Sequence, residues 1–154
     1  MTMNGRWAVA FAVALTCGCA ATNDNRGSDD MVTFTLQAGP RNLGETGKAL
    51  MGPRGDKTVV MLNISGVPPW VVRPVQLYTF VYACSCAAHG TTPAYALNEI
   101  VSAGLLSNNG MSGPFTLEKT VPLPMNTIRS GNYAIVVRTS PADQNVDIYC
   151  GDMK

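Results

Sequence analysis

Cys84, Cys86 and His89 form a compact group of chemically reactive side chains, and Cys150 follows near the end of the chain. A thiolate beside an imidazole is the pairing that many nucleophilic enzymes use. However, the chain has no Cys-x-x-Cys motif, and nothing in the sequence orients His89 or supplies an oxyanion hole. A redox or metal-handling enzyme built on Cys84, Cys86 and His89 is therefore kept as the alternative hypothesis.

Other catalytic and metal-binding patterns are missing from the sequence. The chain contains no Gly-x-Ser-x-Gly, no glycine-rich phosphate loop before a lysine and no His-Glu-x-x-His. His89 is the single histidine, and one imidazole cannot build a His-rich copper or zinc centre. Asp143, Asp147 and Asp152 are expected to lie on a solvated face. We therefore predict no catalytic residue, no cofactor and no metal.

The elements that would position these side chains are short strands. Short apolar stretches, many of them alternating with period two, are separated by Gly, Pro and Asn. One helical turn is predicted at 124–129, and residues 83–109 are expected to form a long irregular loop. The pattern predicts an all-β fold, an antiparallel, Greek-key-like β-sandwich or partly closed barrel. About seven strands are expected, at residues 32–36, 48–51, 58–64, 75–82, 115–121, 132–138 and 146–150.

Aromatic and cationic side chains within and beside these strands have structural interpretations. Arg73 and Arg138 are expected at sheet edges or in ion pairs, because a lone buried charge is costly. Same-face spacing along a strand predicts cross-strand packing more than a binding patch. Packing is therefore expected for the aromatic residues Trp70, Tyr78, Phe80 and Tyr82.

Composition indicates an ordinary folded domain without an electrostatic footprint for nucleic acid. The chain has 154 residues, of which 46% are hydrophobic and 14% charged, so a core can form. The formal net charge is +1, and removal of residues 1–18 takes away Arg6 and no acid, which leaves a net charge of zero. A neutral domain lacks the basic field that nucleic acid requires. Nucleic-acid binding is therefore excluded as an expected function.

The amino terminus has the pattern of an export signal. Arg6 provides a positive charge, and the apolar run 7–15 follows it without interruption. As a helix this run would rise about 14 Å, well short of the ~30 Å bilayer core. Residues 1–18 are therefore predicted to be a removable signal peptide and not a spanning helix.

The end of this segment resembles the lipobox of bacterial lipoproteins. Gly18 precedes Cys19, and this resemblance implies that Cys19 becomes the diacylated first residue of the mature protein. Residues 19–30 are predicted to be a flexible tether to a domain at 31–154. Ala20 after the cysteine resembles lipoproteins sent to the periplasmic face of the outer membrane. The alternative is cleavage after Ala21, which would give a soluble periplasmic or secreted protein.

Five segments in the carboxy-terminal part follow an order that a known family shares. They are Ile64-Ser-Gly-Val-Pro68, the loop cysteine Cys86, Pro93-Ala-Tyr-Ala-Leu97, Gly131-Asn-Tyr-Ala-Ile-Val-Val137 and Tyr149-Cys-Gly-Asp152. Together they resemble the CHRD and copper/zinc superoxide dismutase-like β-sandwich domains of exported bacterial proteins. The resemblance covers residues 58–152, and residues 31–51 would provide the first hairpin.

The resemblance implies both a bond and a missing site. It implies a disulfide between Cys86 and Cys150, which leaves Cys84 unpaired. It also implies metal-binding histidines at positions that here hold Gln76, Tyr78 and Arg138.

These observations predict a non-enzymatic envelope lipoprotein. Its metal-free, superoxide dismutase-like sandwich would serve as a binding or structural module. The expected contacts are the membrane, through the lipid at Cys19, and an envelope protein. The alternative is a periplasmic redox or metal-handling enzyme that uses Cys84, Cys86 and His89.

Overall fold

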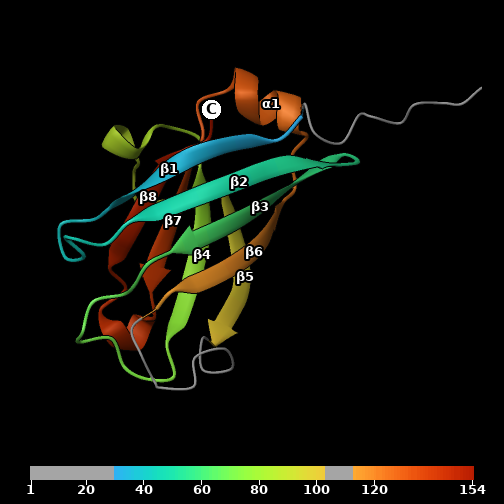
Figure 1. Cartoon of the computed structure of the whole chain (residues 1–154). Coiled ribbons are helices and arrows are strands. Elements are labelled where there is room, and N and C mark those ends of the chain that lie inside the picture. The colour runs from blue at the N-terminus through green and yellow to red at the C-terminus, as the bar shows by residue number, and fades with distance from the viewer. Residues whose placement is uncertain (1–29, 103–112) are drawn as a thin grey trace, which may run out of the picture.

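The computed structural model describes residues 30–102 and 113–154 (Figure 1). The predicted signal at 1–18, Cys19 and the tether up to residue 29 lie outside these described residues. Within the part of the chain that the structure describes, no helix is long and apolar enough to cross a membrane.

Eight antiparallel strands form one continuous sheet among the described residues. Their order in the sheet is β5-β4-β7-β8-β1-β2-β3-β6. The strands are β1 (Val32–Ala38), β2 (Gly47–Arg54), β3 (Lys57–Ile64), β4 (Gln76–Tyr82), β5 (Tyr95–Ser102), β6 (Phe115–Val121), β7 (Ala134–Thr139) and β8 (Asp147–Asp152).

The sheet curls until its two outer strands approach one another. β5 and β6, at opposite ends of the strand order, are in contact, so the sheet is a nearly closed barrel. β3 pairs with β6 instead of β4, and β4 pairs with β7, which is Greek-key connectivity. The predicted all-β, Greek-key-like fold is confirmed, with eight strands in place of about seven.

Alternation along the strands creates the core. In β6 the side chains of Phe115, Leu117 and Val121 are buried, and every second residue along the strand is exposed to solvent. Lys119 breaks this rule, since it occupies an inward position and is only 1% exposed. In β7 the run Ala134–Val137 is buried on both faces, as expected for a central strand.

Residues 83–102 do not form the irregular loop that the sequence predicts for 83–109, and residues 103–109 of that prediction lie outside the described residues. They contain the short turn η1 (Cys86–Ala88) and the whole of β5, which pairs with β4. The residues of β5 include Ala, Asn and Glu, which have weak strand propensity, so local sequence hides this strand. Pairing with β4 determines its conformation.

Two further helical turns lie between the late strands. The helix α1 (Met125–Ser130) begins after Pro124 and ends before Gly131, as predicted, and it buries Met125 and Ile128. The turn η3 (Pro141–Asp143) lies between β7 and β8.

Candidate functional site

The most connected group of polar side chains lies on the outer face of β4, β7 and β8. Tyr78 of β4 pairs directly across from Arg138 of β7, and Arg138 in turn pairs with Asp147 of β8. Leu77, Thr79 and Val81 of β4 point inward, so the residues between them lie on the outer face. The predicted packing of Tyr78, Phe80 and Tyr82 is confirmed, because all three are half-buried or buried.

Arg138 joins three strands through its guanidinium group. Its Nε donates to Oδ1 of Asp147, and its Nη2 donates to the hydroxyl of Tyr82 over 3.1 Å. Its Cζ lies 4.9 Å from the centre of the Phe80 ring, which is a cation–π distance. Burial is the largest single influence and opposes the charged form, but the hydrogen bonds and charges of Asp147 and Tyr82 together outweigh it and raise the pKa of Arg138. The predicted ion pairing of Arg138 is confirmed, on a central strand.

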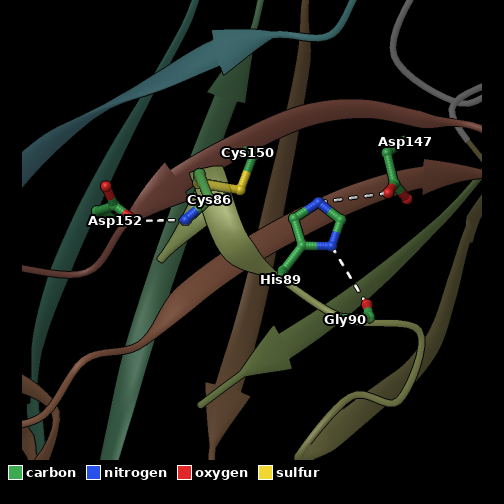
Figure 2. The surroundings of a disulfide bond; sticks show 6 residues. All are labelled: Cys86, His89, Gly90, Asp147, Cys150 and Asp152. Carbon is green, nitrogen blue, oxygen red and sulfur yellow. Dashed lines mark hydrogen bonds and ion pairs between the residues drawn. A yellow bond between two sulfur atoms is a disulfide. The ribbon is translucent and has the colours of Figure 1, made fainter. Parts of the chain in front are cut away.

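His89 approaches the same carboxylate from the turn above the sheet. Figure 2 shows its ring facing Asp147, with Nε2 3.7 Å from Oδ2. The ring centre lies 5.0 Å from that of Tyr82, and Nδ1 lies 3.4 Å from the carbonyl oxygen of Gly90. Asp147 is therefore shared between a permanent cation and an imidazole.

A disulfide holds the turn that positions His89. Cys86 is bonded to Cys150 of β8, as the family resemblance implies (Figure 2). The backbone N–H of Cys86 also donates to Oδ1 of Asp152 over 2.8 Å. Cys84, two residues before Cys86, has a free, half-buried thiol.

The three positions that the resemblance would assign to metal-binding histidines do converge on this face. Gln76, Tyr78 and Arg138 lie on the adjacent strands β4 and β7 and are half-buried. Among the described residues there is no group of three or more His, Cys, Asp or Glu side chains that could hold a metal ion. A guanidinium has no lone pair to offer and repels a cation. The donor set present here therefore does not suit copper or zinc.

The three carboxylates expected on a solvated face do not share one environment. Asp143 is only 5% exposed, which corrects the prediction for this residue. It accepts hydrogen bonds from the N–H of Val72 over 2.9 Å and the hydroxyl of Ser140 over 2.7 Å. Asp147 accepts from Arg138, and Asp152 accepts from the N–H of Cys86. No pattern along the chain predicts these partners.

A second polar group lies between β8 and the loops that follow β1 and β3. Tyr149 is buried, and its hydroxyl donates to the carbonyl oxygen of Gly66 over 2.7 Å. Burial raises the pKa of Tyr149, although hydrogen bonds with Ser65 and Gly66 lower it in part. Asn42 is also buried, and its Oδ1 has no hydrogen-bond partner among the described residues.

A shallow hollow of about 710 Å³ lies on the opposite wall, over β1, β2, β3 and β6. One row of outward side chains crosses it, namely Thr35, Lys48, Asn63 and Thr116. The hydroxyl of Thr116 donates to Oδ1 of Asn63 over 2.8 Å. This row offers hydrogen bonds to a polar ligand but has no group arranged for catalysis.

Comparisons with known proteins identify no relative. No protein family, curated protein or solved structure matches the chain.

Proposed function

We propose that this chain is a non-catalytic envelope lipoprotein, attached to the membrane by a lipid at Cys19. Its domain would be a metal-free member of the CHRD and superoxide dismutase-like sandwiches, and it would serve as a binding or structural module for an envelope partner. The eight-stranded Greek-key barrel and the disulfide from η1 to β8 support the resemblance.

One observation carries this proposal. Arg138 stands where the resemblance expects a metal-binding histidine, and it is committed to Asp147, Tyr82 and Phe80. The guanidinium group of Arg138 repels a metal ion at that position, and its contacts link β4, β7 and β8. The group thus favours a structural role over a metal-dependent reaction.

The enzyme alternative requires a reactive thiol beside His89. Cys86 cannot provide it in this oxidised form, because its sulfur is bonded to Cys150. The imidazole of His89 is directed at Asp147 instead. Thiol titration of the folded chain tests this point. We expect one slowly reacting thiol, Cys84, whose rate of alkylation is the same in His89→Ala. A fast thiol whose reactivity depends on His89 would support the enzyme.

Mass spectrometry of the membrane fraction tests the anchor. We expect a mature chain that begins at Cys19 with an acyl modification, and Cys19→Ser should release the protein from the membrane. Cys17→Ser is the matched control and should leave attachment unchanged. An unmodified chain that begins at Thr22 would refute lipidation.

A further inference from the structure

Two methionines lie on the outer face of the sheet formed by β1, β2 and β3. Met31, which directly precedes β1, is 52% exposed, and Met61 of β3 is 38% exposed. The other exposed large apolar side chains among the described residues are Leu43, Trp70 and Val72, which lie on loops between strands. The exposure of Trp70 corrects its predicted packing. The two methionines therefore belong to a different surface, on the sheet itself.

The side chains of these two methionines lie close together. Met61 pairs directly with Leu50 of β2, and the next outward residue of β2 is Gly52. The side chain of Met31 lies over Gly52, since a Cβ there would be 3.4 Å from Cε of Met31. Both methionines line one shallow hollow of about 480 Å³. We call Met31 and Met61 the methionine pair.

The other methionines of the described residues are enclosed by the fold. Met51 belongs to the same three strands, but its side chain lies in the core and is 0% exposed. Met125 and Met153 are also buried, at 7% and 0% exposure. A dissolved oxidant has to reach the sulfur atom in order to react with it. The fold therefore gives the methionine pair a reactivity that the buried methionines lack.

We propose that the methionine pair is a modification site, at which hydrogen peroxide converts each thioether to methionine sulfoxide. A lone pair of the sulfur attacks one peroxide oxygen, and the O–O bond breaks. The proton on the transferred oxygen moves to the departing hydroxide, which leaves as water. The sulfur is oxidised, the peroxide is reduced, and no further reactant is needed.

Oxidation would change the hollow and leave the core intact. A sulfoxide oxygen accepts hydrogen bonds, and the exposed guanidinium group of Arg54 lines the same hollow as a donor. The apolar lining that Leu50 and Val59 provide would thus gain polar neighbours. A sulfoxide at Met51 would instead place a polar group in the core, at a cost to stability. This inference goes beyond the proposed function and requires neither the lipid nor an envelope partner.

Peptide mapping by mass spectrometry after treatment of the folded chain with hydrogen peroxide tests the proposal. We expect Met31 and Met61 to gain one oxygen each about tenfold faster than the three buried methionines, because their sulfur atoms are accessible. The midpoint of thermal unfolding should stay nearly unchanged when both are oxidised. In denaturant, where the core is open, the rates should become similar.

Matched variants separate the outer face of the sheet from its core. Met31→Leu with Met61→Leu should remove two oxygens from the rapid uptake, and Met51→Leu, a substitution of similar volume, should remove none. Cys84→Ser removes the free thiol as a competing target and should leave both methionine rates unchanged. Equal rates at Met51 and Met61 in the folded chain would overturn the proposal. A lower unfolding midpoint after oxidation of the methionine pair alone would also overturn it.

Discussion

At the scale of single residues, Arg138 links β4 and β8 across β7. Asp147 and Tyr82 accept its hydrogen bonds, and the ring of Phe80 lies under its charge. When one partner of a half-buried polar group is removed, the remaining groups lack a hydrogen-bond partner. The resulting loss of stability exceeds the net contribution of the hydrogen bond.

Replacement of Arg138 tests this role. We expect Arg138→Met to lower the free energy of unfolding by about 1–3 kcal/mol, because Asp147 and the Tyr82 hydroxyl lose a charged donor. Denaturant titration measures the effect. Arg54→Met is a suitable control, since Arg54 pairs with Glu118 at an exposed site and should contribute little. Equal effects of the two variants would contradict the account.

Tyr149 gives the chain a predictable response to alkaline pH. Burial raises the pKa of its phenol in the folded state above the ordinary value of 10.0. Between these two pKa values the folded chain holds a proton that the unfolded chain has lost, so stability falls as pH rises. The contribution of Tyr149 is complete below about pH 10 and is lost as pH rises through the folded pKa.

Tyr149→Phe should therefore flatten the decline of stability above about pH 10 and should cost about 1 kcal/mol at neutral pH, where it removes the bond to Gly66. Thermal unfolding at several pH values measures both effects. Tyr133→Phe, at a half-buried tyrosine, controls for loss of a hydroxyl. A decline as steep in Tyr149→Phe as in the parent chain would count against this interpretation.

At the scale of elements, most strands follow from alternating hydrophobicity, as the exact agreement for β6 at Phe115–Val121 demonstrates. β5 could not be predicted, because its conformation depends on pairing with β4 and not on its own propensities. The disulfide followed from the resemblance and not from the cysteine spacing. The contacts of Arg138, Asp143 and His89 join distant segments, so no local pattern predicts them.

The disulfide joins η1 to β8, and its loss should affect both stability and the position of His89. The bond joins residues that are 64 positions apart. It lowers the conformational entropy of the unfolded chain, which corresponds to about 4 kcal/mol of stability. We expect Cys86→Ser with Cys150→Ser to lower the free energy of unfolding by about 2–4 kcal/mol. Cys84→Ser is the control and should change it little; a larger loss in Cys84→Ser would show that the free thiol has a structural role.

Gly151 marks the close contact of β8 with β1. A Cβ at this position would lie 2.7 Å from Cδ2 of Leu36 and 2.9 Å from the carbonyl oxygen of Thr35. We expect Gly151→Ala to cost about 1–3 kcal/mol by overpacking this seam. A Cβ at Gly90 would have no atom within 4 Å, so Gly90→Ala should leave stability unchanged. Comparison of the two variants by thermal unfolding isolates the steric effect. Unchanged stability in Gly151→Ala would contradict the tight packing of this seam.

At the scale of the whole molecule, different connections form the two ends of the barrel. β1 begins beside the hairpin of β2 and β3, and the loops 39–46, 65–75 and 140–146 lie at the opposite end (Figure 1). The cation-filled face of β4, β7 and β8 would stabilise this frame.

Native mass spectrometry after exposure of the folded chain to copper and zinc ions tests the central claim most directly. We expect the mass of the metal-free chain, with no ion retained after dialysis, since Arg138 occupies the face where imidazoles would be required. One copper or zinc ion per chain, retained by the folded domain and lost on Asp147→Asn, would contradict it.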